Sequence, residues 1–299
     1  MQVIDPHVHF WSLGTHHYPW LENPKTSFVG DARLLKHDYL PGDLSSDAGE
    51  IEIVKIVHVE ANHDPANPVE ETRWLQALAD AGDGRVAGWP NGIVAAADLS
   101  APDAEATLAG HAAFENVRGI RQILNVHDNP LYGYVQRHYL RDPVWHKNFG
   151  LLARYGLSFD LQLYPSQMHE AVQLARMYPD IQIVLNHAGM FVDRDSPAGY
   201  RAWREGLKTL AACPNVAVKI SGLAMFDHHW TVESLRPYVL ETLDTFGVER
   251  AMFASNFPVD RLFGSYDALW QAYARIVAGA SDGERRQLFV ANAERIYRI

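Results

Sequence analysis

Residues 3–11 read VIDPHVHFW, a short apolar run that ends in two histidines, His7 and His9, one residue apart. Because side chains alternate between the two faces of a strand, both imidazoles would point to the same side. A chain with 15 His among 299 residues contains about one such pair by chance, so the pair gains its weight from ending a strand. The stretch predicts a first strand that leads into a polar site.

Seven more apolar runs follow along the chain. Several are continuous runs of Val, Ile and Leu without alternation, which is typical of strands buried on both faces of a parallel sheet. The eight predicted strands are residues 3–8, 53–60, 86–98 with a break at Trp89-Pro90, 117–124, 157–163, 181–187, 216–221 and 251–256.

Amphipathic helical patterns lie between these runs, and several carry start signals. Asn67 and Asp142 each precede a proline at a first helical position, and Ser166 and Thr231 open two further patterns. Strands that alternate with helices predict an α/β fold, a single-domain (β/α)8 TIM barrel over residues 1–299. A doubly wound open sheet is the alternative, but it would more naturally carry a Gly-rich phosphate loop, which this sequence lacks.

Charge and composition exclude several classes of binding partner and site. The 26 Lys and Arg against 36 Asp and Glu give a net charge of −10, and no basic cluster stands out, so nucleic acid and anionic membranes are not expected partners. Cys213 is the single cysteine, which excludes an internal disulfide framework and a Cys-rich zinc site. No leader or long apolar run is visible, so we expect a cytoplasmic protein with a small-molecule substrate. Formation of a homo-oligomer is left open.

In such a barrel, catalytic side chains lie at the carboxyl ends of the strands, and here those ends are polar. His187, in IVLNHAG, would bring a third imidazole to the mouth formed by these ends. Imidazoles that share one face can bind one divalent cation, most readily zinc. Residues 12–46 and 125–141 are too long for simple connectors, so we expect them to be lids. The polar strand ends are His7, His9, Glu60, Arg121, Asp160, Gln162, His187, Lys219, Ser221, Ser255 and Asn256.

Four motifs together resemble the amidohydrolase superfamily, in its "amidohydrolase 2" branch, which includes sugar-acid and dicarboxylate lactonases. They are IDPHVHFW, RGIRQ, LNHAG and FASNFPVD, in that order along the chain. The resemblance implies a distorted (β/α)8 barrel that hydrolyses a cyclic ester by attack of water on the lactone carbonyl. In metal-using members the H-x-H pair, a later His and an eighth-strand Asp surround the cation, which implies His7, His9 and His187 here. Other members work without metal.

The sequence departs from this pattern at Asn256, where the family usually has Asp. An amide cannot accept a proton as a carboxylate does and brings no negative charge to a cation. Glu60 and Asp260 are the nearest carboxylates that could replace it, and Asp260 is the weaker choice because it lies in the following loop. The carboxylated Lys of other superfamily members is also absent, and Arg118 and Arg121 occupy that region.

Two versions of the chemistry are therefore open. In the first, a metal on the three imidazoles lowers the pKa of bound water toward ~7, Asn256 orients the water, and Glu60 or a His takes the proton. In the second, no metal is needed, because imidazoles with an unperturbed pKa of ~6.5 can polarise the carbonyl and move the proton. In both, we expect Arg121, Gln162 and Trp11 to contact the substrate, with Arg121 binding a carboxylate or hydroxyl.

Two other functions are kept in view. The first is metal-dependent decarboxylation of an aromatic acid, and the second is a catalytically degenerate barrel that binds a ligand without turnover. Lactone hydrolysis releases a proton, decarboxylation releases CO2, and a binding protein shows ligand-dependent melting without reaction.

Overall fold

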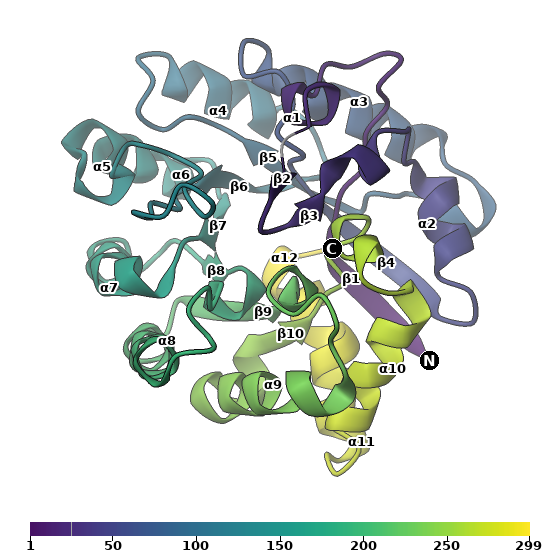
Figure 1. The fold of residues 1–299 in the computed structure, drawn as a ribbon. Coiled ribbons are helices and arrows are strands. Elements are labelled where there is room, and N and C mark those ends of the chain that lie inside the picture. Colours follow the sequence, from purple (N-terminus) through teal and green to yellow (C-terminus); the bar gives the residue numbers. More distant parts are fainter. Residues whose placement is uncertain (25) are drawn as a thin grey trace.

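The computed structural model describes residues 1–24 and 26–299, and in it eight parallel strands form one sheet (Figure 1). Strands that follow one another in this sheet are neighbours, and helices lie outside them, so the predicted (β/α)8 barrel is confirmed. The strands are β1 (Gln2–Val8), β4 (Glu52–Val59), β5 (Gly92–Ala96), β6 (Val117–Ile123), β7 (Ser158–Gln162), β8 (Ile183–Leu185), β9 (Val216–Ile220) and β10 (Ala251–Phe253).

The barrel closes just beyond β10, at the mouth. The backbone N–H of Asn256 donates to the oxygen of His7 at 2.9 Å, and the N–H of His9 donates to the oxygen of Phe257 at 2.8 Å. The register of β1 against β4 shifts between Asp5 and Val8, which distorts the cylinder at this point. Closure itself thus brings the H-x-H pair beside Asn256.

The helices follow most of the predicted start signals. Asp142 and Thr231 cap helices through their side chains, as predicted, but Asn67 makes no such contact. Ser166 lies in a 3-10 turn, and the helix begins only at Met168. The helices around the barrel are α3 (Pro68–Ala81), α4 (Ala104–Ala112), α5 (Pro143–Phe149), α6 (Leu151–Arg154), α7 (Met168–Met177), α8 (Pro197–Ala211), α9 (Val232–Phe246), α10 (Tyr266–Ile276), α11 (Asp282–Arg286) and α12 (Asn292–Tyr297).

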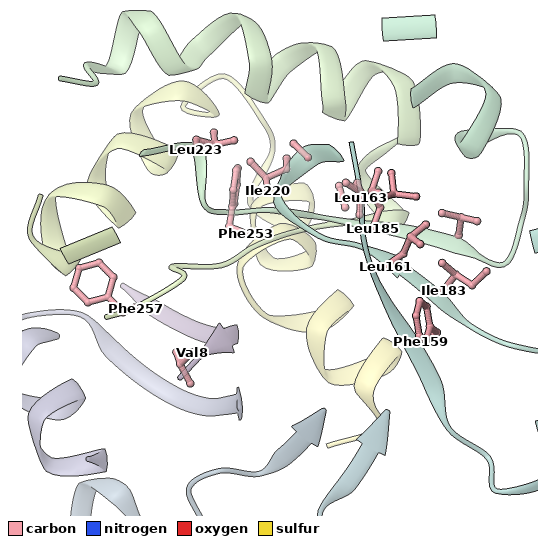
Figure 2. Packing of buried hydrophobic residues seen from close by; sticks show 14 of the residues in the cluster. Val8, Phe159, Leu161, Leu163, Ile183, Leu185, Ile220, Leu223, Phe253 and Phe257 are labelled. Atoms are coloured by element: carbon pink, nitrogen blue, oxygen red, sulfur yellow. The ribbon is translucent and has the colours of Figure 1, made fainter. Parts of the chain in front are cut away.

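Two apolar layers hold the barrel together. The larger one fills the space between strands and helices, and Figure 2 shows part of it, including Phe159, Leu185 and Phe253. The smaller one fills the inside of the cylinder, as expected for a barrel of eight strands. It combines strand residues with three from α12, so that helix packs on the inner layer at the end opposite the mouth; the members are Ile4, Val57, Val59, Val94, Val184, Ala217, Met252, Ala293, Ile296 and Tyr297.

The two predicted lid segments contact each other. Residues 12–46 contain α1 (Pro19–Glu22), a short hairpin of β2 (Thr26–Ser27) and β3 (Gly30–Asp31), and all but the last residue of α2 (Pro41–Asp47). Phe28 of this hairpin lies 5.4 Å from the ring of Tyr132 in the second segment and stacks on Phe226 at 5.3 Å. His228 Nε2 lies 2.9 Å from the oxygen of Phe28, to which it donates. These contacts tie both segments to the loop after β9.

Some predicted bounds need correction. The predicted strand 86–98 begins only at Gly92, because Gly84–Val86 forms a 3-10 turn. The strands predicted to end at His187 and Asn256 end at Leu185 and Phe253, so both polar residues lie in the loops just after the sheet. In the part of the chain that the structure describes, no helix is both long and apolar enough to cross a lipid bilayer.

Candidate active site

Three imidazoles from distant parts of the chain meet at the mouth. The ring centroids of His7 and His9 lie 5.0 Å apart, and those of His7 and His187 lie 4.5 Å apart. The three residues are 0%, 5% and 2% exposed, in that order, so the loops above shield them from solvent. The structure therefore brings together the three His that the sequence singled out.

The backbone around this cluster is strained. His187, Ala188 and Asn256 adopt φ of 54°, 47° and 62°, in the left-handed region that residues other than glycine seldom occupy. Gly222 has a φ of 61°, and a Cβ there would lie 2.5 Å from Nδ1 of His187. Left-handed residues of this kind cost about 1–3 kcal/mol each and cluster at functional sites, so the loops are built to fix His187 and Asn256.

The three imidazoles are neutral at neutral pH. Burial lowers the pKa of His7, His9 and His187 well below its usual value in each case. The charge of Lys219 adds to this for His7, and that of Arg121 adds for His9 and His187. A neutral imidazole offers one N–H and one lone pair, so each ring can both donate and accept.

His9 presents its lone pair to the site. Its Nδ1 lies 2.7 Å from the oxygen of Val59, which can only accept, so Nδ1 carries the hydrogen. Its Nε2 faces Oδ1 of Asn256 at 3.4 Å. Two acceptor atoms thus face each other, and a donor of two hydrogens would satisfy both.

Asp260 holds Asn256 in this orientation. Nδ2 of Asn256 donates to Oδ1 of Asp260 at 2.7 Å. Burial raises the pKa of Asp260 to about 8, and its Oδ2 has no hydrogen-bond partner among the described residues. The 3-10 turn Val259–Leu262 folds back toward Asn256 and so makes this contact possible. The sequence shows only that the two residues are four positions apart, and the contact could not be predicted from that spacing. Asp260 therefore acts on Asn256 rather than taking its place.

Arg121, predicted to bind substrate, is already paired with Glu60. Its Nε donates to Oε1 of Glu60 at 2.6 Å, and its Nη2 donates to the backbone oxygen of Glu60 at 2.6 Å. Its Nη1 donates to Oε1 of Gln162 at 2.9 Å. The backbone N–H of Asn62 donates to the other oxygen of Glu60 at 2.7 Å. These contacts make Glu60 the counter-charge of Arg121 and do not support a role as general base.

Trp11, also predicted to contact substrate, lies in the core. It has no exposed surface, its ring packs 5.7 Å from Trp20, and its Nε1 donates to the oxygen of His37 at 2.7 Å. These contacts support the first lid segment and do not place the indole against a substrate.

Several polar side chains near the mouth had no predicted role: Lys219, Asp160 and Ser255 were predicted only as polar strand ends, and Asp5 was not singled out. Asp5 accepts hydrogen bonds from the N–H of Ser255 at 3.0 Å and from the hydroxyl of Tyr266 at 2.9 Å, and so ties β1 to the loop after β10. Lys219 and Asp160 form a buried ion pair at 2.5 Å. A lysine in the apolar strand VAVKI was the available signal, because a buried ammonium requires a carboxylate partner.

These residues do not fit a divalent cation in the observed arrangement. Lys219 and Arg121 lie close enough to lower the pKa of the three His, and each is already matched by one carboxylate, so no surplus negative charge remains to attract a cation. Asn256 adds no negative charge. Between residues 1 and 24 and between 26 and 299, no three His, Cys, Asp or Glu side chains form a group that could hold a metal ion. That His7, His9 and His187 bind zinc stays a prediction.

The barrel with its cluster of imidazoles at the mouth defines the class of protein. The chain belongs to the amidohydrolase family, whose model matches residues 4–299, as the sequence predicted. Membership supports the prediction of a hydrolase, and members of the superfamily commonly bind a divalent metal.

Individual relatives match over the whole length. The uncharacterized protein y4mH of Sinorhizobium fredii is 49% identical, over 99% of this chain and 98% of its own. The L-fucono-1,5-lactonase of Burkholderia ambifaria is 30% identical, over 99% of this chain and 95% of its own. The crystal structure of an amidohydrolase from Burkholderia multivorans with bound zinc is 25% identical with a TM-score of 0.81, and the match covers 100% of both chains.

Proposed function

We propose that the protein hydrolyses the lactone ring of a sugar acid, using water held among the imidazoles at the mouth. The observation that carries this proposal is the convergence of His7, His9 and His187 in a buried site, with the lone pair of His9 beside Asn256. The relatives named L-fucono-1,5-lactonase, at 28–30% identity, support it.

The reacting water would lie between His9 and Asn256. Nε2 of His9 and Oδ1 of Asn256 both accept hydrogen bonds, and a water molecule can donate one hydrogen to each. The water oxygen then forms a bond to the lactone carbonyl carbon, while its proton passes to Nε2 of His9. The carbonyl electron pair moves onto oxygen, which needs an N–H donor at that point.

Ring opening completes the reaction. The carbonyl bond re-forms as the bond to the ring oxygen breaks, and the leaving oxygen takes the proton from His9. The product is a hydroxy acid, which ionises at neutral pH and releases one proton for each ring opened. Each group returns to its starting protonation state, so the cycle needs no co-reactant and no step in it uses a cation.

Charge favours a neutral sugar lactone over a lactone that carries carboxylates. Arg121 and Lys219, the two buried cations that act on the three imidazoles, are paired with Glu60 and Asp160. A dicarboxylate that bound through either cation would compete with its present partner, and that partner would then be buried without its counter-charge. An aromatic acid that bound through either cation would meet the same cost. Hydroxyl groups need only hydrogen bonds, which polar side chains at the mouth can supply.

A panel of lactones tests the proposal. Five- and six-membered sugar lactones and a pyrone dicarboxylate are given to purified protein whose metal content has been measured, and proton release is followed with a pH indicator. We expect release faster than spontaneous opening with at least one sugar lactone. CO2 release from an aromatic acid would instead identify a decarboxylase, and ligand-dependent melting with no turnover would identify a binding protein. Either of these results without lactone opening contradicts the proposal.

A further inference from the structure

A lysine lies inside the barrel, next to the imidazoles. Lys219 of β9 has no exposed surface and lies on the same face of its strand as Ala217 of the inner apolar layer. Its Nζ donates to Oδ2 of Asp160 at 2.5 Å. A buried ammonium without a counter-charge is strongly disfavoured, so Asp160 is what allows the charge to remain there.

Asp160 is itself held on several sides. Nδ2 of Asn186 donates to Oδ2 at 3.0 Å, and the hydroxyl of Tyr297 lies 2.8 Å from Oδ1 and 3.1 Å from Oδ2. The Nζ of Lys219 also lies 4.9 Å from the centroid of the Tyr297 ring, within cation–π range. The position of the ammonium is therefore fixed by β7, β9 and α12 together.

The ammonium also contacts His7. Nζ of Lys219 lies 3.4 Å from Nδ1 of His7. An ammonium has only hydrogens to donate, so Nδ1 must be the acceptor, and the one proton of the neutral ring must be on Nε2. In the part of the chain that the structure describes, Nε2 of His7 is buried and has no hydrogen-bond partner. A buried N–H of this kind usually has a hydrogen-bond partner, and the described residues supply none to this one.

We propose that Lys219 is a positioning residue that fixes His7 as the tautomer with its proton on Nε2, so that His7 donates a hydrogen bond to the substrate's carbonyl oxygen. The identity of that oxygen rests on the proposed lactone hydrolysis, whereas the tautomer does not. His9, tied to Val59, has the opposite tautomer. Neighbouring rings thus take opposite tasks: His7 stabilises the developing oxyanion and His9 accepts the proton of water.

Nuclear magnetic resonance of the wild-type protein tests the tautomer directly. With ¹⁵N-labelled histidine, the nitrogen shifts and their couplings to ring hydrogens separate a protonated from an unprotonated ring nitrogen, and the His7 signals are assigned by their loss in His7→Gln. At neutral pH we expect Nε2 of His7 to be protonated and Nδ1 to be unprotonated. A proton on Nδ1 of His7 would overturn the proposal, whether or not the protein hydrolyses lactones.

A variant then tests the role of the lysine. In Lys219→Met the His7 signals should show partial protonation of Nδ1, and kcat on the best lactone should fall about tenfold, with KM changed less than twofold, because the donor acts mainly on the developing oxyanion. Should this variant fail to fold, Lys219→Met with Asp160→Asn removes both charges and is measured in the same way. A folded variant with unchanged His7 signals and unchanged kcat contradicts the proposal.

Tyr297→Phe is the matched control. It removes a hydrogen bond to Asp160 but keeps the ammonium beside His7, so we expect the His7 tautomer to stay as in the wild type. A wild type that opens no lactone would refute the proposed function, while the NMR result would still decide the tautomer.

Discussion

The side chain of Asn256 bridges Asp260 and His9, with its amide nitrogen donating to one and its oxygen facing Nε2 of the other at 3.4 Å. The position at which the family usually has Asp is thus occupied by an amide whose orientation a second carboxyl group determines. This relationship explains how the site could keep an acceptor for water without the expected negative charge.

Restoring the carboxylate should change the affinity for metal. Asn256→Asp places a negative charge beside His9, which attracts a cation to the three imidazoles. We expect zinc to bind at least about tenfold more tightly, measured by titration calorimetry with wild type alongside. An unchanged affinity would place Asn256 outside any cation site.

Removing the third imidazole should abolish most of the reaction. His187→Asn keeps a side chain that tolerates the left-handed backbone observed there, so the fold should be retained. We expect kcat on the best lactone to fall by roughly 10²-fold or more, because a donor or acceptor at the reacting centre is lost. The same substitution at the exposed His169 should have no effect. Full activity in His187→Asn would argue against this site.

A methyl group added at Gly222, in the loop after β9, should also lower kcat, because it would displace the His187 ring. Gly222→Ala places a Cβ within 2.5 Å of Nδ1 of His187, at a backbone φ of 61°. We expect a loss of stability of about 1 kcal/mol or more and a clear loss of kcat, since the ring must move. Gly279→Ala, where no atom lies within 4 Å, is the control for a glycine replacement. Equal melting temperature and kcat in the two variants would disprove the crowding.

The free energy of unfolding should depend on pH through the carboxyl group of Glu71. Burial, followed by the charge of Glu60, raises the pKa of Glu71 to about 8 from 4.5. Between these values the folded chain binds a proton that the unfolded chain has released, so this group makes stability fall as pH rises. Glu71→Gln has no such proton, so its Tm relative to wild type should increase from pH 5 to pH 9. A constant difference across this range would contradict the raised pKa.

The barrel could be predicted from the sequence because each strand is a compact apolar run. The predicted ends of the strands were less accurate where polar residues continue the chain beyond a strand. His187 and Asn256 read as the ends of strands, but they belong to left-handed turns just beyond them. The hydrophobic pattern records which residues are buried and not where the sheet hydrogen bonds stop.

The pairing of charges at the mouth could not be predicted in the same way. Sequence reasoning identified Glu60, Arg121 and Lys219 as polar strand ends, but their partners depend on side-chain reach across the cylinder. Arg121 comes from β6 and Glu60 follows β4, and β5 lies between these strands in the sheet. An ion pair between two strands that are not neighbours in the sheet does not appear as a regular spacing in the sequence.

The contact between Tyr297 and Asp160 has a consequence for biosynthesis. His7 and its strand are synthesised before α12, which follows them by more than 280 residues. Until that late helix docks, Asp160 lacks one of its donors and the ammonium lacks its aromatic neighbour. A nascent chain that has completed all eight strands would therefore still lack two of the contacts that hold the ammonium in place.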